Sequence, residues 1–288
     1  MSASPRVMTI AQWAGGAPWA LELQHSEEDH ALVWQTRGQA RCVIEAVRRG
    51  VSVHTALVIP AGTPFSLELG RQNFGLVCLI PRNGPLGMPD RPTILRIREV
   101  QAQAEVTGIL DALQREQNMA RPFMDEALSA HGALLTVWLR RAMIESGQTE
   151  ERSSAAMRLA AAYSALIERD YMTGKPMADY AKSLGVTPTH LTRVCRDCSG
   201  RTAAALLTER CLHAARMALE RGDRPITQIA ATLGFSSGAY FSRFILHHTG
   251  RSPSALRKAA ATARSIAPTG AKSASAPPRG LAVSGGRL

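Results

Sequence analysis

The chain has 288 residues, of which 45% are hydrophobic, and this length allows two folded domains. Its formal net charge of +11 comes from one part of the chain, because residues 171–288 carry 17 basic and 5 acidic side chains while residues 1–170 carry 17 and 18. There is no apolar run long enough for a transmembrane helix, no secretory-signal layout at the start, and no cysteine pattern typical of a disulfide-stapled domain. We therefore expect a cytoplasmic protein without membrane contact, whose basic part binds a polyanion.

Short apolar runs alternate with turn residues in the first third of the chain and predict antiparallel strands. The runs are rich in Val, Ile, Leu and Thr, which favour strands. They cover Leu21–Leu23, Ala31–Thr36, Arg41–Val47, Val51–Ile59, Phe65–Leu69 and Leu76–Ile80. Over residues 1–92 we expect these strands to close into a small β barrel or sandwich.

After Pro92 the apolar residues recur with a period of about 3.6, which predicts a helical connecting section over residues 93–150. Its apolar stripe around Leu134 and Trp138 is compatible with core packing or with a self-association face. The polar segment Gly147–Ser154 predicts a linker. At the far end, Ser265–Leu288 is poor in large apolar side chains and is predicted to be a disordered basic tail.

The basic part contains an internal repeat. Ala181–Thr187 recurs as Ala230–Ser236, and further matches follow each copy at an offset of 50. Each copy predicts a short helix, a Leu-Gly turn, a polar capping residue and a second helix with an exposed arginine, which is a helix-turn-helix. Between the copies, Thr202–Arg221 has no Gly or Pro and predicts one continuous helix of about 30 Å. Such a connector can place two recognition helices in adjacent major grooves.

The second copy resembles the signature of AraC/XylS-type transcription regulators. The resemblance is carried by Ile229–Ser236, Ala239–Phe244 and Gly250–Pro253, and the first copy fits the first helix-turn-helix of that family. It implies a double helix-turn-helix domain over residues 155–262. The segments Arg37-Gly38 and Ile59–Phe65 look like the cupin-type sensor domain that many members carry at the N-terminus. The predicted fold class is therefore α+β, with an N-terminal antiparallel β barrel, a helical section and an all-α C-terminal domain.

The resemblance also assigns DNA contacts to residues of this chain. Base-edge contacts would come from Thr189, Thr192, Arg193, Ser237, Gly238, Ser242 and Arg243. Contacts to phosphates would come from Thr187, Arg196, Arg201, Thr227, Ser236 and Arg251. Of these, Thr187, Thr227 and Ser236 are also expected to cap helices. The arginines at 193 and 243 are the sharpest candidates, because a guanidinium can form a bidentate pair with guanine.

The chain departs from the family pattern in both units. Ile245 and Leu246 stand where a Phe-Lys pair is usual, so one phosphate-binding cation is missing. Gly238 is small where many members carry a polar reader, and Cys195 replaces the usual core Phe. These departures predict less stringent reading by the second unit and looser packing in the first.

The function we expect is that of a sequence-specific, ligand-responsive transcription activator and not of an enzyme. Its partners would be double-stranded promoter DNA, RNA polymerase, a small organic effector and a second copy of the chain in a homodimer. No cofactor and no metal are expected. The strand residues Trp34, His54 and Phe65 are the candidate effector contacts.

Two other interpretations of the sequence compete with the transcription regulator. A cupin-type metal enzyme with a nucleic-acid-binding module would need a His-x-His ligand pair, which the sequence lacks, and Cys195 and Cys198 have no second cysteine pair with which to hold zinc. A sequence-neutral architectural protein would bind DNA with a steep salt dependence and little site preference.

Overall fold

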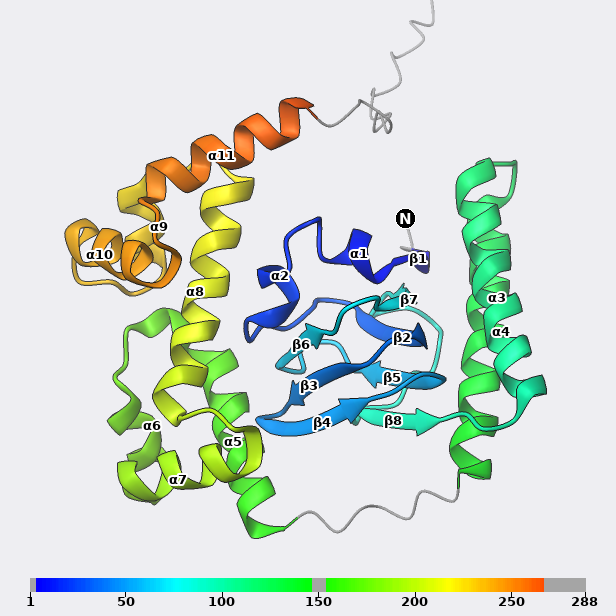
Figure 1. The fold of residues 1–288 in the computed structure, drawn as a ribbon, viewed down its shortest axis with the longest axis horizontal. Coiled ribbons are helices and arrows are strands. Elements are labelled where there is room, and N and C mark those ends of the chain that lie inside the picture. Colours follow the sequence, from blue (N-terminus) through cyan, green and yellow to red (C-terminus); the bar gives the residue numbers. More distant parts are fainter. Residues whose placement is uncertain (1–3, 147–153, 267–288) are drawn as a thin grey trace, which may run out of the picture.

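The computed structural model describes residues 4–146 and 154–266 (Figure 1). Its N-terminal part contains two antiparallel sheets, one in the order β1-β7-β2-β5-β8 and one in the order β4-β3-β6. The strands are β1 Arg6–Thr9, β2 His30–Arg37, β3 Ala40–Ile44, β4 Val47–Val51, β5 Thr55–Ile59, β6 Phe65–Leu69, β7 Phe74–Ile80 and β8 Thr93–Arg96. Two short helices, α1 Ile10–Trp13 and α2 Trp19–Glu22, follow β1.

Strand β2 is the central strand of the larger sheet, and its residues 31–35 are buried. It pairs with β5 and β7, and Trp34 lies between Ala56 on one neighbour and Leu76 on the other. One face of this sheet forms a core with the hairpin of helices α3 Val100–Met119 and α4 Met124–Glu145 (Figure 1). The other face forms a second core with the smaller sheet. Burial on both faces explains why these strands read as continuous apolar runs.

The α+β class is confirmed. Of the two forms predicted for residues 1–92, the closed barrel is wrong, and the sandwich agrees with two separate sheets that share one core. The predicted run Arg41–Val47 contains a turn at Glu45 and Ala46, whose φ angles are 50° and 58°. The sequence hides this turn because neither residue is glycine or asparagine. Arg49 and Gly50, which separate two of the predicted runs and were therefore expected in a turn, lie inside β4 instead.

Two further segments differ from the sequence prediction. Leu21 lies in helix α2 and not in a strand, with its side chain 1% exposed in the second core. The helical section was predicted to begin at residue 93, but Thr93–Arg96 is strand β8 and pairs with β5. Beyond that strand, α3 and α4 agree with the predicted helical section.

The C-terminal part is entirely helical within the residues described. It consists of α5 Ala155–Asp170, the 3-10 helix η1 Tyr171–Thr173, α6 Met177–Ser183, α7 Pro188–Ser199, α8 Ala203–Arg221, α9 Ile226–Thr232, α10 Gly238–Thr249 and α11 Pro253–Ile266. The predicted continuous connector is confirmed as α8, which the hydroxyl of Thr202 caps. Most of the predicted linker and all but the first two residues of the predicted tail lie outside the described residues.

No helix of the described chain combines the length and the apolar character needed to cross a bilayer.

Candidate nucleic-acid interface

The first helix-turn-helix consists of α6 and α7. Gly185 makes the turn between them with a φ of 69°, a left-handed conformation that glycine adopts without steric cost. The hydroxyl oxygen of Thr187 accepts a hydrogen bond of 3.2 Å from the backbone N–H of His190 and caps α7. Leu191, Val194 and Cys195 bury the inner face of α7. The capping role predicted for Thr187 is therefore confirmed.

The outer face of α7 carries the residues that the sequence assigned to DNA. Thr189, Arg193 and Arg196 are exposed, whereas Thr192 is half-buried. A guanidinium nitrogen of Arg193 lies 3.2 Å from Nδ1 of His190, so the histidine orients the arginine along the helix surface. The first unit thus exposes a hydroxyl and two guanidinium groups to solvent on one helix.

The second helix-turn-helix, α9 and α10, has the same turn at Gly234 with a φ of 75°. Its caps differ from the prediction. The hydroxyl of Ser237, and not of Ser236, accepts from the backbone N–H of Tyr240 at 3.1 Å and caps α10. Helix α9 begins after Pro225 without a side-chain cap, so Thr227 lies within its first turn and caps nothing.

The predicted readers of the second unit lie at the start and on the outer face of α10. Gly238 is its first residue, Ser242 is half-buried, and Arg243 is exposed. Arg251 and Ser236 are also exposed, at the two ends of the unit. Because Ser237 already accepts a backbone hydrogen bond, its hydroxyl has only its proton and one lone pair left for a base.

Sequence reasoning missed two residues at equivalent positions of the repeat. Tyr240 is 51% exposed on α10, and His190 occupies the matching place on α7, 50 residues earlier. Both can present a polar group beside the exposed arginine that follows three residues later. The offset of 50 was the signal that could have identified them, since it already paired Arg193 with Arg243.

Arg201, predicted to bind a phosphate, is held by the N-terminal part of the protein. Its guanidinium donates to Glu68 Oε1 at 2.8 Å, to Ser66 Oγ at 3.0 Å and to Glu209 Oε2 at 2.6 Å. Burial raises the pKa of the Glu209 carboxyl to about 7, and the charge of Arg201 opposes this rise. In this arrangement Arg201 joins the two parts of the chain, with three of its five N–H donors engaged and its side chain 17% exposed.

A second polar contact joins α8 to the segment that follows α2. Arg210 donates to both carboxylate oxygens of Glu168 at 2.7 and 2.8 Å, and Ser26 donates to the same carboxylate at 2.8 Å. Burial alone would raise the pKa of Glu168, but the hydrogen bonds and charge of Arg210 hold it below its usual value. The guanidinium also lies 3.7 Å from the ring centroid of Tyr171. The two opposite charges thus compensate each other, and both side chains have further polar or aromatic contacts.

Apolar side chains complete the contact between the two parts. Ala46, at the turn between β3 and β4, is fully buried in the core of the first helix-turn-helix. Leu23 packs against the core of the second. The N-terminal domain therefore touches both DNA-binding units and restrains their arrangement along α8.

The predicted effector contacts do not form one site. Trp34 and Phe65 are both 0% exposed and belong to different cores. Trp34 donates to Thr107 Oγ1 at 3.1 Å and its ring centroid lies 6.2 Å from that of His54. Nδ1 of His54 is buried without a hydrogen-bond partner in the described part of the chain. Phe65 instead contacts His25 and Trp13.

The cysteines are free thiols, and Cys195 is fully buried while Cys198 is half-buried. Burial raises the pKa of the Cys195 thiol to about 12, so it is a neutral core residue. Among the residues described, no three His, Cys, Asp or Glu side chains gather as a metal-binding group.

Comparison with known proteins gives matches for the C-terminal part and for the whole chain. Residues 180–259 match a family model described as a helix-turn-helix domain, whereas a search of curated proteins finds no match. An apo structure of ToxT from Vibrio cholerae is 15% identical over 88% of this chain and 96% of its own, with a TM-score of 0.42. An AraC-type DNA-binding domain protein from Chromobacterium violaceum is 26% identical over 37% of this chain and 95% of its own, with a TM-score of 0.33. The C-terminal domain of AraT from Geobacillus stearothermophilus is 25% identical over 38% and 88%, with a TM-score of 0.34.

The matched segment contains both helix-turn-helix units and the helix between them, from Tyr180 in α6 to Ala259 in α11. The signature residues Ile229, Ala230, Leu233 and Phe241 are buried in the core of the second unit. Residues 180–259 of this chain are therefore an AraC-type helix-turn-helix domain, built of two units that α8 joins.

Proposed function

We propose that the protein reads two adjacent major-groove segments of promoter DNA, with α7 in one and α10 in the next. The observation that carries this is the equivalent placement of Arg193 and Arg243. Both lie exposed, one turn after a capped helix start, on units joined by the unbroken helix α8. Each guanidinium can pair with a guanine and contribute about 1–3 kcal/mol of discrimination. Thr189, Thr192, Ser237, Gly238 and Ser242 would complete the base contacts.

Contacts to phosphates would come from exposed groups at the ends of these helices, namely Thr187, Arg196, Thr227, Ser236 and Arg251. Such contacts position a protein on DNA without reading its sequence. Arg201 would join them only after it leaves Glu68 and Ser66. We call the arrangement in which the N-terminal domain packs against both helix-turn-helix units the docked arrangement. It therefore presents fewer phosphate contacts than a chain in which the two parts have separated.

We further propose that the N-terminal domain controls this arrangement in response to a small organic effector. An effector can shift the arrangement only if it binds one form better than the other. The buried, unpartnered Nδ1 of His54 beside Trp34 supports these two residues as contacts, whereas Phe65 serves the core. We propose too that the protein activates transcription through RNA polymerase, acts in the cytoplasm and is not an enzyme, as its resemblance to AraC/XylS-type regulators implies.

We also propose that two copies associate through α4. Leu134, Val137 and Ile144 are 54%, 43% and 81% exposed on the side of α4 that faces away from the sheet. They recur at helical spacing and form an apolar stripe that its own chain leaves uncovered. A second copy could cover it by the same contact in reverse, as two-fold symmetry requires.

Selection of bound sequences from a random DNA pool, at physiological salt, tests the reading of DNA. Enrichment of two short motifs about one helical turn apart is expected for the full chain. Arg243→Ala should remove the preference at one base position, while Arg251→Ala should weaken binding to all sequences alike. A pool that stays flat for the full chain, or an equal loss on selected and scrambled DNA from Arg243→Ala, would defeat the assignment.

A further inference from the structure

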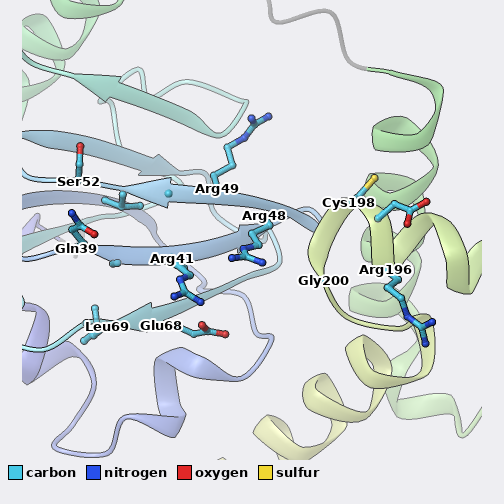
Figure 2. A pocket seen from close by; sticks show the side chains of 15 residues that line it. Gln39, Arg41, Arg48, Arg49, Ser52, Glu68, Leu69, Arg196, Cys198 and Gly200 are labelled. Atoms are coloured by element: carbon cyan, nitrogen blue, oxygen red, sulfur yellow. The ribbon is translucent and has the colours of Figure 1, made fainter.

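A polar cleft of about 1000 Å³ lies where the N-terminal domain meets the first helix-turn-helix (Figure 2). Its floor is the outer face of the three-stranded sheet β4-β3-β6, and its wall is the last turn of α7. The cleft is separate from the predicted readers Thr189 and Thr192, which lie at the opposite end of α7. It is also separate from Trp34, which belongs to the other sheet, and from His54, which lies in the turn before β5.

The strand register explains why arginines gather on the floor. Arg41 pairs with Gly50 on one neighbouring strand and with Glu68 on the other, so the three positions form one row on the outer face. Arg48 lies in the next row of the same face, opposite Val43. A Cβ built on Gly50 would meet nothing within 4 Å, and the floor between the two arginines is therefore open.

Three of the arginines that line this cleft form no ion pair within the described residues. In the described parts of the chain, Arg41, Arg48 and Arg196 make no hydrogen bond or ion pair with another side chain. The carboxylate of Glu68 is engaged by Arg201, which leaves Asp197 as the remaining acid at the rim. Arg48 points from β4 toward the end of α7, and its guanidinium lies beside Gly200 (Figure 2).

We propose that this cleft binds a small, multiply charged anion bearing phosphate or carboxylate groups. Arg41 and Arg48 of the N-terminal domain would hold it, and Arg196 of the first helix-turn-helix, whose guanidinium points away from them in Figure 2, would turn toward the anion. Guanidinium groups match the planar or trigonal oxygen arrangement of both classes of anion, and charge-assisted hydrogen bonds of this kind are strong. Since its ligands come from both domains, the bound anion would fasten the docked arrangement.

A DNA duplex fits the cleft less well than a small anion. The predicted base readers Thr189, Thr192 and Arg193 lie in the first half of α7, while the cleft is lined by its last turn and is bounded by a sheet on one side. The carboxylates of Glu68 and Asp197 would repel a continuous phosphate chain but leave room for a compact anion between the arginines. Occupation of the cleft would also withdraw Arg196 from DNA phosphates.

The test is calorimetric titration of the full chain, without DNA and at constant ionic strength, with inorganic pyrophosphate in one arm and citrate in the other. One of the two should bind, and the arm that does so names phosphate or carboxylate as the preferred group. Arg41→Gln, Arg48→Gln and Arg196→Gln should each weaken this binding about tenfold or more, the loss expected for one charged hydrogen bond. Arg115→Gln, an exposed arginine on α3, is the matched control and should change nothing.

No binding of either anion at millimolar concentration would overturn the proposal, as would an equal loss in Arg115→Gln. If anion binding were weakened by Arg41→Gln and Arg48→Gln but not by Arg196→Gln, the claim that the anion binds both domains would be wrong. If Arg41→Gln and Arg48→Gln weakened DNA binding without affecting either anion, the cleft would be a duplex contact instead. Thermal melting of each variant checks its folding, and because no DNA is present in the titration, its outcome is independent of the DNA-reading assignment.

Discussion

The imidazole ring of His25, in the N-terminal domain, stacks on that of His213 in α8, with 4.4 Å between ring centroids and 11° between ring planes. Each ring uses one nitrogen for a backbone carbonyl, His25 with Leu23 at 2.8 Å and His213 with Ala20 at 3.1 Å. A carbonyl can only accept, so each ring is a donor on that side. The contact between the two domains thus contains two parallel, buried rings whose neutral forms suit it.

We expect the docking of the two domains to weaken as the pH falls from about 6.5 toward 4. Burial lowers the pKa of His25 to about 4, and burial followed by the charges of His25 and Arg210 lowers that of His213 still further. A histidine whose pKa is lowered in the folded state binds fewer protons there than in the unfolded chain, so stability is present at higher pH and is lost in this window. The loss is on the order of 3 kcal/mol for His25, from 1.36 kcal/mol for each pKa unit. The charged groups that act on the pair are Arg210, Arg221, Glu168 and Glu27.

Denaturant unfolding at a series of pH values measures this dependence. His213→Phe keeps an aromatic ring in the stack but removes one titrating group, and it should flatten the curve between pH 6.5 and 4. His131→Gln, on α4 outside the contact, should leave the curve as it is. A curve that His213→Phe does not alter would show that the stacked pair does not control the acid response.

The pair Arg210–Glu168 should be among the costliest polar contacts to break. The side chains are 9% and 21% exposed, so removal of either partner leaves a charge that water reaches poorly. Glu168→Gln or Arg210→Met should lower the free energy of unfolding by about 3 kcal/mol. Arg6→Gln breaks the exposed pair with Asp29 and should cost less than about 1 kcal/mol. Equal losses in chemical denaturation would contradict the ranking.

The two turn glycines should differ in their tolerance of alanine. Both have left-handed φ angles, so a Cβ costs about 1 kcal/mol of strain at either. At Gly185 the added carbon would meet nothing within 4 Å, whereas at Gly234 it would come within 2.6 Å of the carbonyl oxygen of Met172. Gly234→Ala should therefore cost about 1–3 kcal/mol more than Gly185→Ala, because backbone atoms must move. Similar unfolding midpoints for the two variants would show that the second unit can shift away from η1.

The apolar stripe of α4 predicts a dimer that a single charge can dissociate. Leu134→Glu would place a carboxylate against the same stripe of the second copy and should raise the dimer dissociation constant at least about tenfold. Ser129→Glu adds the same charge to an exposed position on another side of α4 and should have little effect. Sedimentation analysis measures both. A wild-type chain that remains monomeric at high concentration would refute self-association through this face.

Local patterns in the sequence were sufficient for the DNA-binding units. The turn glycines and the cap at Thr187 act within a few residues, so they could be interpreted without knowledge of the fold. The repeat at an offset of 50 is visible in the sequence itself. The same holds for α8, whose 19 residues contain no helix breaker. The error at Ser236 and Ser237 was one residue wide, which is the usual uncertainty of a helix start when two serines are adjacent.

The arrangement of the N-terminal domain depended on contacts that sequence patterns do not record. Buried apolar runs predicted strands, but the turn at Glu45 and Ala46 has no glycine to reveal it. Closure into a barrel or separation into two sheets is decided by which strands pair, and these pairs join residues far apart in the chain.

What the sequence by itself determined was the presence of two helix-turn-helix units and the helix that joins them, because helix propensity, turns and caps are local properties. Only the tertiary structure decided which arginines remain available. Arg193 and Arg243 stay exposed, whereas Arg201 is bound by Glu68, 133 residues away in the sequence. The availability of a charged group depends on the groups that surround it in space, and these come from every part of the folded chain.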